Sequence, residues 1–407
     1  MPSIVVKIDS SSLATPEKIE QIAKRLIEQK NAGNQIVAVV PAVENIEDKL
    51  LQYAQILSDN PAKREHHALT ALNSQVASSL LAISIVKQGV QAVSLTGWQA
   101  GIEVVETDYD VLLEGINPTY ITESVNQDCI VIVAGSQGID ANRNILLLGE
   151  GGPETTAVAI GAAIGARQVE IFTVQDGIYT ADSTVVEQAS KLKQVTYDEM
   201  LELANLGASF IHPRAVELAK IVEMPLVVRS STENSEGTLI KGEVDMEKNI
   251  IVRGIAYEAD IIRLTVGYDS YEQSSLADIF TTLAEHRIDV DIIVQAVIDG
   301  VKPTVSFSIA KEDFAEAIKV LEKNKAELGF SFADFEVGLA KVSIVGAGMV
   351  SNPGVAARMF DRLRKENILV KMVSTSEIKV SVVVPQDEMV RAANVLHDEF
   401  NLVDVLA

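Results

Sequence analysis

The chain has little cysteine and little histidine, and this shortage excludes several kinds of protein. Its 407 residues include 1 cysteine, Cys129, and 5 histidines. A single cysteine cannot form a disulfide within the chain, and with so few histidines no cysteine-rich metal cluster is expected. We therefore expect a cytoplasmic protein with no metal site of this kind.

The chain is also poor in basic residues and in long apolar runs. Its 34 Lys and Arg residues stand against 57 Asp and Glu residues, which gives a formal net charge of −23. An acidic surface repels the phosphates of nucleic acids and anionic lipid headgroups. Neither a signal peptide nor a run of about 18 apolar residues is present. We expect no nucleic-acid partner, no membrane partner and no secretion.

Hydrophobic residues are plentiful, at 47%, and their pattern indicates the fold class. Up to about residue 230, short β-branched runs such as Ile4–Val6 and Gln35–Val40 alternate with longer helical stretches such as Glu17–Gln29. This alternation is typical of a mostly parallel sheet covered by helices. We predict an α/β domain over residues 1–235.

The remainder of the chain is organised differently. Residues 231–249 are polar and charged, which favours a connector. Beyond them a strand, helix, strand pattern occurs twice, at a spacing of about 80 residues. We predict two βαββαβ modules, at 250–335 and 336–407. Because such modules have free edge strands, we expect them to pair with each other or with a second chain.

One loop has the composition of an anion site. Gly149, Gly151 and Gly152 follow a β-rich run and precede an alanine-rich helical stretch. Glycines let backbone N–H groups approach a phosphate, and a helix N-terminus attracts negative charge. The same residues also fit a tight turn between a strand and a helix, and composition alone leaves both interpretations open.

Longer motifs match a known family. The chain resembles bacterial aspartokinases with two regulatory ACT modules. The matching stretches are residues 96–101, 197–204, 212–217, 228–231, 346–349, 352–355 and 374–378. The resemblance implies an amino-acid-kinase domain followed by paired ACT modules. It also implies the family reaction, in which Mg-ATP phosphorylates L-aspartate to 4-phospho-L-aspartate, the first step toward lysine, threonine and methionine.

The first catalytic loop of the family is altered here. The family begins with Lys-Phe/Tyr-Gly-Gly-Thr-Ser, in which the lysine meets the transferred phosphate, whereas this chain has Lys7 followed by Ile8, Asp9, Ser10 and Ser11. The lysine is kept. Asp9 adds a negative charge beside the expected triphosphate, and both glycine conformations are lost.

The substrate loops show further changes of charge. The family's Gly-Arg-Gly-Gly-Ser-Asp motif has Glu150, Pro153 and Glu154 at its arginine, serine and aspartate positions. An arginine is the best receptor for the carboxylate of aspartate, and a glutamate repels it. Glu154 keeps an acid that is one methylene longer. Other family substrate positions also differ from the pattern; they are Pro41, Glu47, Ser74 and Glu103.

The nucleotide loop of the family is partly retained. By resemblance, Thr173, Gly177, Tyr179 and Asp182 are nucleotide-binding positions. Val174 replaces the family's aspartate, and the Pro-Arg pair that ends the family motif is missing. We therefore expect weak binding of ATP.

The regulatory half keeps more of the family pattern. The resemblance implies that lysine, threonine or both bind the ACT modules as effectors and that the modules form a homodimer. The implied contacts are Asp269, Ser275, Asp289, Gln295, Asn352, Val355 and Glu377. The first module lacks the family's Pro-Gly before its helix, and the second module looks intact.

These changes leave three functional hypotheses. The favoured one is an aspartokinase-like protein with lost or weak kinase activity that keeps a regulatory and dimerising role, alone or with an active aspartokinase. Here Mg-ATP is a cofactor only if activity remains, and Lys7 and Glu154 are the catalytic candidates. The alternatives are an active kinase of altered specificity, in which Glu103 and Glu150 select a cationic or neutral substrate, and an ordinary aspartate kinase that tolerates the replacements.

Overall fold

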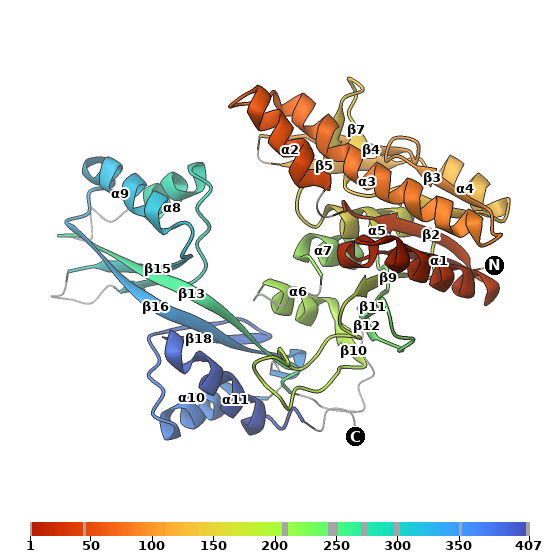
Figure 1. Cartoon of the computed structure of the whole chain (residues 1–407). Helices are drawn as coiled ribbons and strands as arrows, with labels where there is room; N and C mark the ends of the chain where they lie inside the picture. Colours follow the sequence, from red (N-terminus) through yellow and green to blue (C-terminus); the bar gives the residue numbers. More distant parts are fainter. Residues whose placement is uncertain are drawn as a thin grey trace. The chain divides into compact units, whose positions relative to one another are not determined.

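The computed structural model describes residues 2–43, 46–108, 110–205, 211–242, 251–269, 276–296, 302–349 and 352–403. The chain forms two compact units (Figure 1). The first comprises Met1–Ile178 and Lys191–Glu247, and the second comprises Tyr179–Ser190 and Lys248–Val405. Each unit is described by itself below.

A mostly parallel sheet forms the centre of the first unit. Its order is β10-β12-β11-β9-β1-β2-β6-β3, and among its described pairs only β11 and β12 run antiparallel. The α/β fold class predicted from the alternating pattern is confirmed. The strands are β1 (Ser3–Lys7), β2 (Gln35–Val40), β3 (Ala92–Leu95), β6 (Ile130–Ala134), β9 (Gln168–Thr173), β10 (Gln194–Thr196), β11 (Leu226–Ser230) and β12 (Thr238–Lys241).

Helices cover both faces of this sheet. The helices of the unit are η1 (Ser10–Leu13), α1 (Pro16–Asn31), α2 (Ile46–Leu57), α3 (Lys63–Lys87), α4 (Thr119–Asn126), α5 (Gly152–Ala163), α6 (Tyr197–Asn205) and α7 (Pro213–Ile221). Helix α1 begins at Pro16 after the Thr15 cap, whose hydroxyl accepts from the Lys18 N–H at 3.4 Å.

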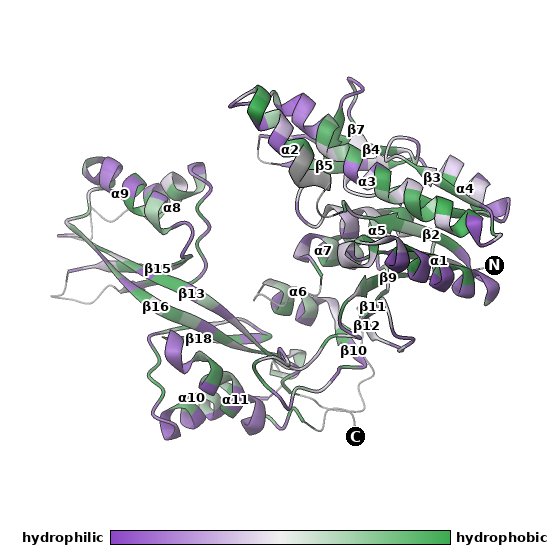
Figure 2. Cartoon of the chain, viewed as in Figure 1, coloured by the Kyte–Doolittle hydropathy of each residue, from purple (hydrophilic) through white to green (hydrophobic). Residues whose placement is uncertain are grey.

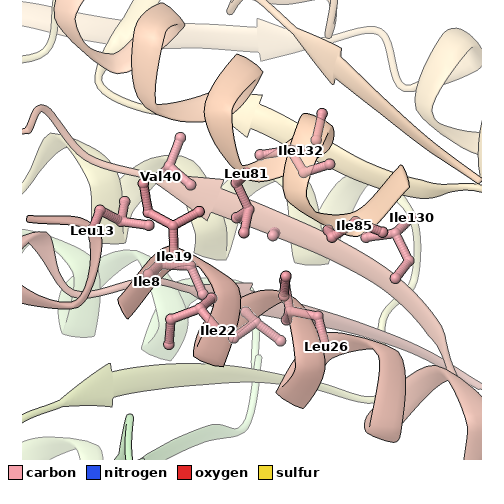
Figure 3. Close-up of a cluster of buried hydrophobic side chains, with 14 of the residues drawn as sticks. Ile8, Leu13, Ile19, Ile22, Leu26, Val40, Leu81, Ile85, Ile130 and Ile132 are labelled. Carbon is pink, nitrogen blue, oxygen red and sulfur yellow. The ribbon is translucent and has the colours of Figure 1, made fainter. Parts of the chain in front are cut away.

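The core on one face lies between the sheet and helices α1 and α3. Helix α1 buries Ile19, Ile22 and Leu26, which recur at the helical period, against Leu81 and Ile85 of α3 and the even-numbered residues of β1, β2 and β6 (Figure 3). The outward residues of α1 are mostly hydrophilic (Figure 2). Helix α5 contacts the other face, where a Cβ at Gly161 would lie 2.7 Å from Cγ2 of Val169.

A second, smaller sheet lies in the same unit. Its order is β5-β4-β7-β8, with β4 (Ile102–Glu106), β5 (Val111–Ile116), β7 (Gln137–Ile139) and β8 (Ile145–Leu147). Helix α3 contacts β8 as well as β3 and β6 of the large sheet. Among the described helices, α3 alone is long and apolar enough to cross a membrane by length and composition. Half of its apolar window is buried inside the protein.

The second unit is built on an antiparallel sheet of order β14-β15-β13-β16-β18-β17. Its elements are β13 (Gly254–Gly267), α8 (Leu276–Glu285), β14 (Ile293–Ala296), β15 (Thr304–Ala310), α9 (Phe314–Leu328), β16 (Phe332–Val345), η3 (Ala347–Met349), α10 (Val355–Lys365), β17 (Met372–Thr375), β18 (Lys379–Pro385), η4 (Gln386–Glu388) and α11 (Met389–Glu399). Helices α8 and α9 cover one core, and α10 and α11 cover another.

Strands β13 and β16 run through both halves of this sheet. Gly254–Glu258 pairs with Lys341–Val345, and Ile261–Gly267 pairs with Phe332–Leu339 after two shifts of register. The predicted module limit at 335 and 336 therefore falls inside β16, and the first five residues of β13 complete the second module. The two modules share their central strands.

Candidate active site and effector sites

The two catalytic candidates meet in the first unit. Strand β1 ends at Lys7, and Glu154 lies in the first turn of α5, which contacts β1. The Lys7 Nζ lies 2.5 Å from Oε1 of Glu154, and the two side chains are 12% and 15% exposed. This ion pair neutralises the lysine that the family pattern assigns to the transferred phosphate.

The loop after Lys7 is held by its own side chains. Asp9 precedes η1, accepts from the hydroxyl of Ser11 and accepts from that of Ser12 at 3.4 Å. The Ser12 N–H donates to the Asp9 carbonyl at 3.2 Å, so it is not free for an anion. Ser10 is the first residue of this 3-10 turn. A carboxylate and a closed turn occupy the place of the family's two glycines.

Two glycines of the glycine loop have backbone conformations or contacts that require glycine. Gly149 and Gly151 have φ of 72° and 66°, which favours glycine. A Cβ at Gly151 would lie 2.3 Å from the ring of His212, so the close approach also requires glycine. Pro153 is in the first turn of α5, where its missing N–H is harmless. Glu150 is exposed on this loop.

The other altered substrate positions present no positive charge to a carboxylate. Ser74 is buried, donates to carbonyls of Ala71 and Gly135 at 3.3 Å, and accepts from Nε2 of Gln137 at 2.7 Å. Pro41 is buried after β2, and Glu103 is exposed on β4. Glu47 lies in α2, and its side chain is outside the described part of the chain.

Arg214 supports the glycine loop, and sequence reasoning cited it only as part of a family motif. Its Nη1 donates to the Leu148 carbonyl at 2.5 Å and its Nη2 to the Val111 carbonyl at 2.7 Å, while Asp110 lies 3.2 Å away. This guanidinium ties α7 to the strand and loop before α5. A cation in the first turn of a helix, where the macrodipole disfavours it, is a sequence signal that could have indicated such a role.

The nucleotide candidates divide between the two units. Thr173 ends β9, and its hydroxyl donates to the Gln175 carbonyl at 2.7 Å. Gly177 is needed for packing, because a Cβ there would lie 2.7 Å from Oγ1 of Thr238. Val174, at the position of the family's aspartate, is 75% exposed.

Tyr179 and Asp182 belong to the second unit. Asp182 accepts from the backbone N–H and the hydroxyl of Thr184 at 2.8 and 2.7 Å and from the Tyr257 hydroxyl at 2.9 Å. Partial burial raises the pKa of Asp182, but these hydrogen bonds together lower it by more. The net pKa therefore lies below its usual value. The carboxylate is committed to structure within its own unit.

The same segment is joined to the helix that ends the second module. The hydroxyl of Thr180 lies 2.9 Å from Nε2 of buried His397, and the Asn394 amide donates to the Val185 carbonyl at 3.0 Å. Burial lowers the pKa of His397, and the nearby Asp398 opposes this shift. The chain after Ile178 is therefore fixed by α11.

The described donors do not fit Mg-ATP well. Lys7 is paired with Glu154, Asp9 places a carboxylate beside it, and Val174 stands where an acid is expected. A triphosphate needs cations and free N–H groups, and a magnesium ion needs oxygen ligands that are not committed elsewhere.

Three effector candidates lie at one edge of the second module. Asn352 donates to the Gly348 carbonyl at 2.7 Å, Val355 begins α10, and Glu377 is exposed in the turn between β17 and β18. The Gly346 N–H donates to the Ile378 carbonyl at 2.9 Å, which joins the two loops that carry these residues.

The first module brings its candidates together only in part. Asp269 is paired with Lys302 at 2.6 Å, and Gln295 pairs with Val305 near the same end of the sheet. Asp289 accepts from its own neighbour Val290 at 3.0 Å and precedes β14, toward the opposite end. Ser275 lies outside the described residues.

Comparison with known proteins settles the family. Residues 2–230 match the model of the amino acid kinase family, and residues 342–400 match an ACT domain. An aspartokinase from Bacillus sp. (strain MGA3) is 48% identical over 402 residues, which cover 99% of this chain and 98% of that protein. The chain belongs to the aspartokinase family. Aspartokinase 2 of Bacillus subtilis (strain 168) is also 48% identical, with the same coverage.

A solved structure supports the fold of this aspartokinase-family chain. E. coli aspartokinase III in complex with lysine and aspartate, in its T-state, superposes with a TM-score of 0.77 at 20% identity, covering 98% of this chain and 99% of that one. The family predicted from the motifs is confirmed, as is the order of a kinase domain before an ACT domain. The individual site residues stay predictions.

Proposed function

We propose that this aspartokinase-family protein has lost most or all of its aspartate phosphorylation and acts through its ACT modules as a regulatory subunit. The observation that carries this proposal is the Lys7–Glu154 ion pair, next to a loop in which Glu150 takes the place of the carboxylate-binding arginine. Acidic side chains thus stand at positions where the family pattern has anion-binding groups.

Charge is the physical reason. Phosphoryl transfer depends almost wholly on positioning and on neutralising phosphate charge. Within the described loops at 7–12, 148–154 and 212–214, the cations are Lys7 and Arg214. Lys7 faces Glu154, and Arg214 binds two carbonyls. Even a displacement of about 1 Å in such a site costs roughly 100-fold in rate.

The regulatory role rests on the second unit. The edge that carries Asn352, Val355 and Glu377 is the proposed effector site for lysine, threonine or both. Apolar residues Phe335 and Val337 of β16 are 53% and 57% exposed, which supports a dimer formed through the ACT sheet. A hetero-oligomer with an active cytoplasmic aspartokinase is the proposed setting.

The test uses the purified full chain. Aspartyl phosphate formation from ATP and aspartate is measured alongside calorimetric binding of lysine and threonine. We expect no phosphorylation above background and saturable binding of at least one effector. Ordinary ATP-dependent formation of aspartyl phosphate would refute the loss of activity. Failure of both effectors to bind would refute the regulatory role.

A working kinase is the second candidate, because specific features favour it. Lys7 and the positive-φ backbone of Gly149 and Gly151 are retained, and full-length relatives at 48% identity are aspartokinases. This candidate has two versions. In one, Glu103 and Glu150 select a cationic or neutral substrate; in the other, the enzyme is an ordinary aspartate kinase. Tight binding of Mg-ATP by calorimetry would favour this candidate, and its absence would eliminate both versions.

A further inference from the structure

A polar cavity lies in the first unit beside residues 228–231, a family motif to which no catalytic role is assigned above. Helix α1 lines one wall, and the other is lined by Arg229 of β11 together with Ser231, Thr232 and Asn234 of the loop that follows this strand. The cavity volume is about 410 Å³, within the range of small-ligand sites. Its lining includes three cations, Lys24, Arg25 and Arg229.

Arg229 is satisfied by the protein itself. Its Nη1 donates to Glu170 at 3.1 Å and its Nε to the Ser235 carbonyl at 3.0 Å. Glu170 is 2% exposed and also accepts from the amides of Gln29 and Gln168 at 2.7 and 2.9 Å. This buried carboxylate therefore compensates one guanidinium.

Arg25 forms no ion pair with a described carboxylate. Its guanidinium stacks on the ring of Phe172 at 4.3 Å, and its Nη1 is buried without a hydrogen-bond partner among the described atoms. Burial lowers the pKa of Arg25, and the positive charge of Arg229 lowers it further. The acids that oppose this effect are Glu170 and Glu28. Glu28 is 65% exposed and lies 4.0 Å from Lys24 at the rim.

We propose that this cavity, named here the Arg25 cavity, binds a small dianion that carries phosphate or carboxylate groups. Planar guanidinium groups recognise both of these groups through paired hydrogen bonds. Three cations face two acids in the Arg25 cavity, so it carries a net positive charge in a chain whose formal charge is −23. Asn234 supplies a neutral polar group on the wall that also carries Arg229.

A neighbouring cavity provides an internal comparison. It has a volume of about 440 Å³ and is lined by Lys24 and Lys87 together with Glu17 and Glu20. Lys87 lies 2.5 Å from Glu20, so its charge is compensated. Size alone therefore does not single out the Arg25 cavity. The difference is Arg25, a partly buried cation whose Nη1 has no hydrogen-bond partner among the described atoms.

The Arg25 cavity is one hydrogen bond from the strand that leads into the candidate nucleotide loop. The Ser231 N–H donates to the Thr173 carbonyl at 2.8 Å. An anion held by Arg25 and Asn234 would thus order the backbone beside β9. The proposal does not depend on the loss of kinase activity, because neither Lys7 nor Glu154 lines the cavity.

The experiment is calorimetry on the full chain with two probes, inorganic phosphate and succinate, against chloride at equal ionic strength. We expect at least one probe to bind with a Kd below about 1 mM. Arg25→Gln should weaken binding about tenfold, because a charge-assisted bidentate contact is lost. Asn234→Ala should weaken it about threefold. Lys87→Gln, in the neighbouring cavity, should leave the Kd unchanged.

The relative affinity of the two probes and its change in the variants decide the proposal. Tighter binding of phosphate would identify a phosphorylated ligand, and tighter binding of succinate a dicarboxylate; either supports the proposal. Binding of neither probe would overturn it, as would binding that is unchanged in Arg25→Gln and in Asn234→Ala. If Arg25→Gln does not fold, as a thermal melt would reveal, Asn234→Ala decides alone, because Asn234 is a loop residue outside the core.

Discussion

Two covered lysines, one in each unit, face acids in different settings. Lys7 is 12% exposed, ends a strand of a parallel sheet and meets one glutamate from the first turn of a helix. Lys341 is 6% exposed, lies within β16 and meets both Glu258 and Asp291 at 2.6 and 2.5 Å. The first lies where loops gather and ligands bind in α/β folds, and the second lies inside a ladder. The position of each lysine in its sheet, at a strand end or within a strand, therefore distinguishes the candidate site residue Lys7 from the structural residue Lys341. Their burial does not.

The largest expected effect is at Lys341. We expect Lys341→Met to lower the free energy of unfolding of the second unit by about 2 kcal/mol, because the covered lysine takes part in two ion pairs whose carboxylates are partly exposed. Chemical denaturation measures this change. Lys302→Met, which breaks the exposed pair with Asp269, is the control and should change little. An equal effect of the two substitutions would contradict the distinction.

The same ion triad has a pH signature. Burial lowers the pKa of Lys341, but Asp291 and Glu258 raise it by more, so the net pKa lies above 10.5. Its stabilising contribution is therefore complete below pH 10.5 and is lost as pH rises through the folded-state pKa. In Lys341→Met this alkaline loss should disappear.

Acid should affect the second unit through His397. Because burial lowers the pKa of this histidine below 6.5, the unfolded chain binds the proton first as pH falls. Stability should fall below pH 6.5 with a slope of up to about 1.4 kcal/mol per pH unit, until the folded-state pKa is passed. His397→Gln should remove this slope, as denaturation at a series of pH values would reveal. A slope that persists in the variant would place the proton elsewhere.

The smallest expected effect on stability is at Lys7. We expect Lys7→Met to cost about 1 kcal/mol, because it removes a single ion pair, whereas Lys341 forms two. Glu154→Gln should have a similarly small effect on denaturation but should increase ATP binding, because Lys7 becomes free for a phosphate. Glu217→Gln, on α7, serves as a charge-matched control and should not increase ATP binding. A cost at Lys7 as large as that at Lys341 would make this pair structural.

Much of the fold could be predicted because it depends on local patterns. The β-branched runs placed β1 and β2, and the glycines at 149 and 151 marked the turn into α5. Lys7 and Glu154 were both named from motifs, although no pattern indicated that they form an ion pair.

The remainder depends on contacts between distant residues, which local patterns do not contain. The Arg214 contacts with Leu148 and Val111 span 66 and 103 positions of sequence. The sequence of the segment after Ile178 resembles the nucleotide loop of the family, yet Thr180 contacts His397, 217 positions away. The sharing of β13 by two modules was likewise hidden, because a single strand gives no sign of which partners it will have.

That shared strand limits how the regulatory half can be divided. A fragment that begins at residue 336 would lack the five residues of β13 that pair with Lys341–Val345, so β16 would expose an open edge where a neighbour now lies. Neither module is a self-sufficient building block. Because both modules contribute pairing partners to β13, we expect the two modules to fold and unfold together.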